Sequence, residues 1–185
     1  MSNKSLYLSI NTDLAPIRMI SAIIFDLGDT LIHQRIDDQE TLDQMDLTLQ
    51  DHAREILDYL FKHYRLNILS NTETTTSLQL RQALKKMDID HFFEHVLTSV
   101  DIGIKKPAPL MFETMLNHLK CTPESVIMVG NDINGDIMGA QNMGIKTVFY
   151  SIVPSDIKRF QESRIQPDYI IKNLIDLIKL SSTWN

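Results

Sequence analysis

Short runs of aliphatic residues alternate along this chain with longer segments whose apolar positions follow a helical period. The runs are apolar almost throughout, which is typical of strands that are buried on both faces of a parallel sheet. We expect strands at Ile20–Phe25, Leu66–Leu69, Val96–Leu97, Val126–Val129, Thr147–Tyr150 and Tyr169–Ile171.

The segments between these runs are predicted to be helices, because their apolar residues recur at intervals of three and four. This alternation predicts the α/β class, with a doubly wound, mostly parallel sheet that is flanked by helices. The first expected helix is Leu49–Tyr64, and the second is capped by Thr72 and carries Leu78, Leu80 and Leu84. The third has Pro107 or Pro109 in its first turn, and the fourth, Asp132–Met143, is ended by Gly144. The fifth carries Leu174, Leu177 and Ile178.

Composition narrows the classes of protein that fit. The net charge of −6 gives the chain no general attraction to nucleic acid or to anionic membranes. No apolar run approaches the ~18 residues that a membrane span needs. The single cysteine, Cys121, allows no disulfide framework. We therefore expect a cytoplasmic protein without a nucleic-acid or membrane partner, and we leave open whether it forms a homo-oligomer.

Polar residues stand at the ends of successive predicted strands, where ligands bind in a doubly wound sheet. Each of them alone has an ordinary structural interpretation, as a helix cap, a first-turn acid or a solvated loop residue. Together they bring carboxylates, a hydroxyl, an amide and an amine to one edge of the sheet. The candidates are Asp26, Ser70, Asn71, Lys106, Asn131, Asp132 and Asp136.

The chemistry of this set is that of a metal and a phosphate. Carboxylate, amide and backbone oxygens are the ligands that Mg²⁺ prefers. A lysine, a hydroxyl and helix N-terminal amides suit a phosphoryl group. A carboxylate that faces the phosphorus atom beside a metal could attack it and form an aspartyl-phosphate.

The order of these residues resembles the haloacid dehalogenase-like hydrolase superfamily, whose members are mostly Mg²⁺-dependent phosphatases. FDLGDTL is similar to the first motif of that family, ILSN to the second, KKPAP to the third and VGNDINGD to the fourth. The resemblance runs from about Ser21 to Leu180, which is nearly the whole chain.

The resemblance implies a role for each candidate. Asp26 would be the nucleophile. Ser70, helped by the amide of Asn71, would hold the phosphoryl oxygens, and Lys106 would neutralise both nucleophile and phosphate. The implied ligands of Mg²⁺ are Asp26, the backbone carbonyl of Gly28, Asp136, and either Asn131 or Asp132, because the family allows two spacings.

The chain departs from the family at one position. Family phosphatases carry a second aspartate two residues after the nucleophile, and it acts as general acid and base. Here that residue is Gly28, and the acid is displaced to Asp29. We keep Asp29 as a catalytic candidate, although adjacent side chains on an extended segment point in opposite directions.

Three functions follow from this departure. The first is a phosphoric monoester hydrolase that is slow or specialised, the second a phosphate-, metal- or partner-binding relative that does not turn over, and the third a dehalogenase-type hydrolase. A missing general acid costs roughly 10² to 10⁴ in rate.

The expected domain organisation is simple. Residues 1–20 are an N-terminal extension in which Leu6, Leu8 and Ile10 alternate with other residues and could form an edge strand. Residues 21–185 form a single core domain. Within it, residues 32–48 are long enough for a flap and too short for a full cap, so we expect an open site that suits a bulky phosphorylated substrate.

Overall fold

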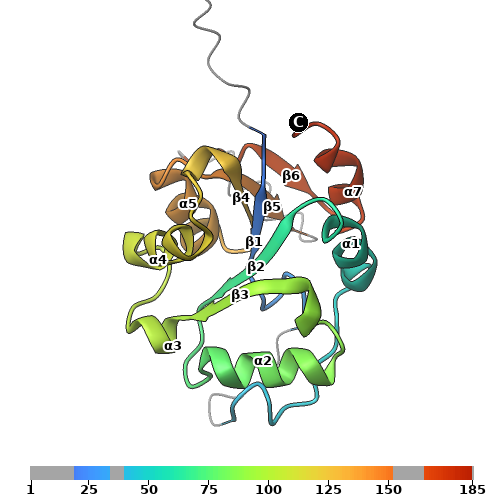
Figure 1. Cartoon of the computed structure of the whole chain (residues 1–185), viewed down its shortest axis with the longest axis vertical. Coiled ribbons are helices and arrows are strands. Elements are labelled where there is room, and N and C mark those ends of the chain that lie inside the picture. The colour runs from blue at the N-terminus through green and yellow to red at the C-terminus, as the bar shows by residue number, and fades with distance from the viewer. Residues whose placement is uncertain (1–18, 34–39, 152–164, 185) are drawn as a thin grey trace, which may run out of the picture.

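A computed structural model describes residues 19–33, 40–151 and 165–184 of the chain. It contains a six-stranded sheet in the order β3-β2-β1-β4-β5-β6, and every neighbouring pair of strands is parallel. The doubly wound α/β fold expected from the sequence is therefore confirmed (Figure 1). The strands are β1 (Ala22–Phe25), β2 (Arg65–Ser70), β3 (Phe93–Thr98), β4 (Val126–Gly130), β5 (Lys146–Tyr150) and β6 (Tyr169–Ile171).

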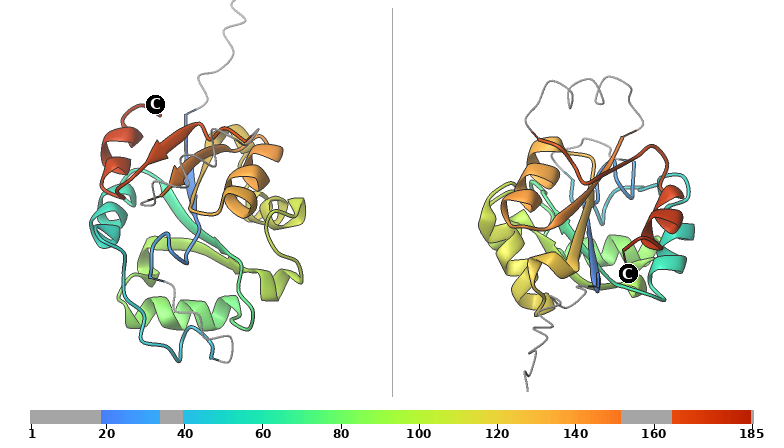
Figure 2. Two further views of the ribbon diagram at one scale, coloured as in Figure 1. Left: turned by 180° about the vertical axis from the view of Figure 1, so that it is seen from behind. Right: turned by 90° about the horizontal axis from the view of Figure 1, so that it is seen from above.

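Helices cover both faces of the sheet, as Figures 1 and 2 show. Seen from behind, α1 and α7 lie side by side on one flank, whereas α4 and α5 lie on the other (Figure 2). The helices are α1 (Ala53–Leu60), α2 (Ser77–Lys86), α3 (Ser99–Ile102), α4 (Pro109–Leu119), α5 (Gly139–Asn142) and α7 (Asp176–Ser181), with the 3-10 turns η1 (Asp90–Phe92) and η2 (Pro123–Ser125) and the π-helical η3 (Ile133–Met138).

The central strand β1 contributes to two hydrophobic cores because successive side chains point to opposite faces. Ile23 and Phe25 pack with residues of α1, α2 and α7. Ala22 and Ile24 pack with residues of α4 and α5. This burial on both faces explains why the strand reads as a continuous apolar run, and it fixes the position of Asp26 directly after the strand.

The second helix begins later than the sequence suggested, and Thr72 is not its cap. Helix α2 is capped by Thr76, whose hydroxyl and backbone N–H form a capping box with Gln79. The Thr72 hydroxyl instead donates to the carbonyl of Thr75 at 2.7 Å, within the loop that leads from β2. The box supplies two bonds where a single cap supplies one, which decides the start of the helix.

Two other predicted helices differ in their bounds. The predicted Leu49–Tyr64 helix is shortened to α1, because Leu49 forms an antiparallel bridge with Ile32. The predicted Asp132–Met143 helix begins as the π-helical η3 and continues as α5. Its end is where we expected it, at Gly144, which has a left-handed φ of 75°.

Two expectations lie partly or wholly outside the part of the chain that the structure describes. The edge strand around Leu6, Leu8 and Ile10 falls within residues 1–18, and the flap includes residues 34–39. None of the helices in the described ranges is long and apolar enough to cross a bilayer.

Candidate active site

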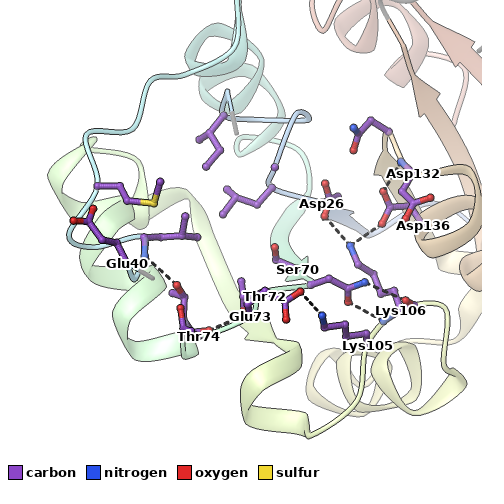
Figure 3. Close-up of a pocket in the computed structure, with 18 residues that line it drawn as sticks. Asp26, Glu40, Ser70, Thr72, Glu73, Thr74, Lys105, Lys106, Asp132 and Asp136 are labelled. Atoms are coloured by element: carbon purple, nitrogen blue, oxygen red, sulfur yellow. Dashed lines mark hydrogen bonds and ion pairs between the residues drawn. The ribbon is translucent and has the colours of Figure 1, made fainter. Parts of the chain in front are cut away.

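A cavity of about 430 Å³ opens at the carboxyl ends of the central strands (Figure 3). The sheet topology makes it, because parallel strands deliver the residues that follow them to the same edge. Most of the residues singled out from the sequence line this cavity. They are Asp26, Gly28, Ser70, Asn71, Lys106, Asn131, Asp132 and Asp136.

Lys106 lies at the centre of the buried side of the cavity. Its ammonium donates to Asp26 Oδ1 at 2.7 Å, to Asp136 Oδ1 at 2.6 Å and to the carbonyl oxygen of Leu69 at 2.7 Å. All three ammonium hydrogens therefore have acceptors, although the side chain is almost completely buried. Burial alone would lower the pKa of Lys106, but the charges of Asp136 and Asp26 outweigh it and raise the pKa above its ordinary value.

The two carboxylates beside Lys106 carry more negative charge than one lysine balances. Burial and the charge of Asp26 together raise the pKa of Asp136 to about 7, although Lys106 opposes the shift. The second oxygen of Asp136 accepts from the backbone N–H of Asp132 at 3.0 Å. This excess of buried negative charge is the kind of environment that a divalent cation stabilises.

Asn71 holds Lys106 in position through the backbone. Its side-chain amide donates to the Lys106 carbonyl at 3.0 Å, and its side-chain oxygen accepts from the Lys106 N–H at 2.8 Å. The side chain of Asn71 thus joins the loop after β2 to the loop before α4. Ser70 is buried at the end of β2 and lines the cavity beside it.

Thr30 is a site residue that the sequence analysis missed. Its fully buried hydroxyl lies 3.1 Å from both Asp26 Oδ2 and Asn131 Oδ1, so it links the first and fourth motifs. The sequence did contain a signal for this role, because a threonine stands four residues after the candidate nucleophile and directly before two apolar residues. A buried hydroxyl requires a partner, and the site supplies two acceptors.

The two candidates for the fourth-motif metal ligand, Asn131 and Asp132, have different hydrogen-bond partners. The side chain of Asn131 faces Asp26 through the shared Thr30 hydroxyl. The carboxylate of Asp132 instead accepts from the Asn134 N–H at 2.9 Å and caps the helical segment that follows. Asp132 is exposed at the edge of the cavity.

Gly130 makes room for Asp136. A Cβ atom on Gly130 would lie 2.2 Å from Asp136 Oδ2, which is far inside van der Waals contact. Among glycines 103, 130, 135, 139 and 144, only this one has the carboxylate of Asp136 against its backbone. The last residue of β4 is therefore glycine because an aspartate must turn back over it.

Gly28 and Asp29 occupy different environments. Gly28 lines the cavity, whereas Asp29 is exposed and is not part of the lining. Asp29 adopts a left-handed φ of 55° in a turn in which its N–H donates to the Ile32 carbonyl at 2.8 Å. Gly28 does not belong to the positive-φ glycines of the described chain, which are Gly103 and Gly144. The structure thus brings the other candidates together and leaves Asp29 outside.

The part of the flap that the structure describes forms one wall of the cavity. Glu40, Leu42 and Met45 line it, and the Leu42 N–H donates to the buried Thr75 hydroxyl at 3.0 Å. The facing wall is the polar loop at residues 72–75, where Glu73 forms an ion pair with Lys105. The described residues of the flap and the loop at 72–75 thus line two sides of the cavity.

The groups in the cavity that could bind a metal ion are oxygen atoms. Within the described residues, no three His, Cys, Asp or Glu side chains gather as a metal-binding cluster. The site offers instead the carboxylates of Asp26 and Asp136 with the amide oxygen of Asn131. Such a set suits Mg²⁺, which commonly takes one or two carboxylates and keeps several waters.

Comparison with known proteins places the chain in a family. A model described as "Haloacid dehalogenase-like hydrolase" matches residues 29–150. A glyceraldehyde 3-phosphate phosphatase of Methanothermobacter thermautotrophicus is 33% identical over 121 residues, which cover 65% of this chain and 51% of that protein. A pyrophosphatase PpaX of Bacillus mycoides is 33% identical over 122 residues, covering 66% of this chain and 54% of that protein.

The fold agrees with this placement. An uncharacterized protein from Listeria monocytogenes serotype 4b has a similar structure, with a TM-score of 0.76 and 25% identity over 87% of this chain and 96% of that one. The chain belongs to the haloacid dehalogenase-like hydrolase family, as the motifs suggested. It spans about half the length of the two named relatives.

Proposed function

We propose that this chain is a Mg²⁺-dependent phosphatase that transfers the phosphoryl group of its substrate to Asp26 and then to water. The observation that carries the proposal is the buried arrangement of Asp26, Lys106 and Asp136 at the carboxyl ends of β1 and β4. The names of the two relatives support it, because both describe enzymes that cleave a bond to phosphorus.

In the proposed reaction, a carboxylate oxygen of Asp26 attacks the phosphorus atom and the bond to the leaving group breaks. Lys106, fixed by Asn71, donates to Asp26 and offsets the charge of the phosphoryl oxygens. Ser70 and the backbone N–H of Asn71, whose side chain is bound to Lys106, hold the phosphoryl group from the end of β2. Water then attacks the aspartyl-phosphate and releases inorganic phosphate.

We infer that Mg²⁺ is held by Asp26, Asp136, Asn131 and the backbone carbonyl of Gly28. The excess buried negative charge and the set of oxygen donors support this choice. Asp132 is assigned to helix capping because it is exposed and its carboxylate accepts the Asn134 N–H at the start of the helical segment that follows. When bound, the cation would neutralise the phosphoryl oxygens.

We further propose that residues 21–185 act as one core domain with a flap and without a full cap. The flap residues Leu42 and Met45 line the cavity, which is of the size that holds a small molecule. We therefore favour a small phosphorylated compound as substrate over the bulky one expected from the sequence.

The test is release of phosphate from p-nitrophenyl phosphate with and without Mg²⁺, for the wild-type chain and for Asp26→Asn. The proposal expects Mg²⁺-dependent turnover that the substitution abolishes, while the circular dichroism spectrum stays unchanged. Binding of Mg²⁺ and phosphate without turnover would support the non-catalytic alternative. Release of halide from a 2-haloacid, without phosphatase activity, would support the dehalogenase alternative.

A further inference from the structure

Among the residues that the structure describes, the cavity wall directly after the proposed nucleophile carries no titratable side chain at position 28. Gly28 lines the cavity there and has no titratable atom. Asp29 is held by its left-handed backbone and its turn hydrogen bond, and its exposed side chain is not part of the cavity lining. The turn thus keeps the carboxyl group of Asp29 outside the cavity that Asp26 lines.

The acids on the β4 side of the cavity are already committed as acceptors. Asp136 accepts from the Lys106 ammonium with one oxygen and from the Asp132 N–H with the other. Asp132 accepts from the Asn134 N–H. Both oxygens of Asp136 and one oxygen of Asp132 therefore already face donors of the chain and not the space beside Gly28.

The acids of the opposite walls are also occupied or distant. Glu73 is paired with Lys105. Glu40 lies on the flap, at the other end of the cavity from Asp26 and Lys106 (Figure 3). Among the residues that the structure describes, the cavity therefore presents no carboxylic acid beside Gly28.

We propose that the substrate of this site is a phosphate compound whose leaving group departs as a stable anion, namely an acyl phosphate or a phosphoanhydride rather than an alkyl phosphate. This inference rests on the proposed function. A carboxylate oxygen of Asp26 forms a bond to phosphorus, and the leaving oxygen takes the electron pair of the broken bond. A carboxylate or phosphate anion needs no proton at that moment, whereas an alkoxide does.

The same arrangement makes the second half-reaction the slow one. The water that attacks the aspartyl-phosphate must lose a proton, and among the described residues no carboxylate lies beside Gly28 to receive it. The proton passes to solvent, the bond between phosphorus and Asp26 breaks, and the carboxylate is regenerated. The phosphorylated form of Asp26 therefore accumulates when a good phosphoryl donor is supplied.

The first experiment compares acetyl phosphate, p-nitrophenyl phosphate and glycerol phosphate as substrates of the wild-type chain with Mg²⁺, using Asp26→Asn as the background. The rates with acetyl phosphate and p-nitrophenyl phosphate should exceed that with glycerol phosphate by roughly 10² or more. Rapid quenching should show an initial burst of product that approaches one equivalent of protein. Similar rates for all three compounds would overturn the inference and leave the proposed function intact. Hydrolysis of none of them would overturn both.

The second experiment transposes the two residues in Gly28→Asp/Asp29→Gly, which keeps composition and net charge and places glycine at the left-handed position. Hydrolysis of glycerol phosphate should rise by up to roughly 10² to 10⁴ because its leaving group now receives a proton. Turnover of acetyl phosphate should also rise, because its slow second half-reaction is accelerated, and the burst should vanish. Gly28→Asn/Asp29→Gly is the matched control, with the same shape but no acid, and it should show no gain. An equal gain in the control, or no gain in the transposed variant, would contradict the inference.

Discussion

The ammonium of Lys106 lies 2.7 Å from Asp26 Oδ1, across 80 positions of sequence. This contact joins the end of β1 to the loop before α4, and the same ammonium reaches Asp136 after β4. Replacement of one side chain therefore changes the charge balance of three segments at once.

Lys106→Met should abolish turnover and destabilise the fold. It leaves the buried Asp26 and Asp136 without a counter-charge, and removal of one partner of a buried pair costs about 3–5 kcal/mol. Urea denaturation measures the loss. Lys106→Met/Asp136→Asn should recover part of the stability but none of the activity, because one buried charge is gone. If Lys106→Met were as stable as wild type, Lys106 would not act as the counter-charge of the buried Asp26 and Asp136.

The metal assignment predicts opposite results for two neighbouring residues. Asn131→Ala should raise the Mg²⁺ concentration needed for half-maximal turnover by at least tenfold, whereas Asp132→Asn should change it less than twofold. The reason is that Asn131 faces the site, while Asn replaces Asp equally well as a helix cap. Titration of activity with Mg²⁺ measures both, and the reverse order would assign the ligand to Asp132.

Gly130→Ala should displace Asp136 without replacing any charged residue. The added Cβ would meet the Asp136 carboxylate at 2.2 Å, so either the backbone or Asp136 must move, at a cost of about 1–3 kcal/mol. Activity and thermal stability should both fall. Gly103→Ala is the control: its Cβ meets nothing within 4 Å, so it should show only the backbone strain of a positive φ. Full activity in Gly130→Ala would show that Asp136 tolerates displacement.

The left-handed backbone at Asp29 predicts an unusual order of stabilities. Asp29→Gly should be more stable than Asp29→Ala by about 1 kcal/mol, because only glycine adopts a φ of 55° without a steric cost. At Gln82, an exposed interior position of α2, the order of the same two replacements should be reversed. Chemical denaturation of the four variants tests this, and alanine as the better residue at position 29 would contradict the turn geometry.

Much of the site could be predicted because buried parallel strands are recognisable in the sequence as apolar runs. The residues that follow such strands lie at the same edge of the sheet. Thr30 was missed because its role depends on two acceptors that come from distant segments. The start of α2 was misplaced because Thr72 and Thr76 are equally good caps in isolation. Only the neighbouring Gln79 and the loop geometry distinguish them.

The sequence by itself determined the fold class. It also showed which polar residues follow each predicted strand, and that residue 28 is a glycine. These follow from local periodicity and residue identity, which need no knowledge of distant contacts. Tertiary structure alone decided that Asn131 and not Asp132 faces Asp26, that Asn71 clamps Lys106, and that Asp29 lies outside the cavity. These depend on where backbone turns aim each side chain, and a one-residue difference in a turn reverses that direction.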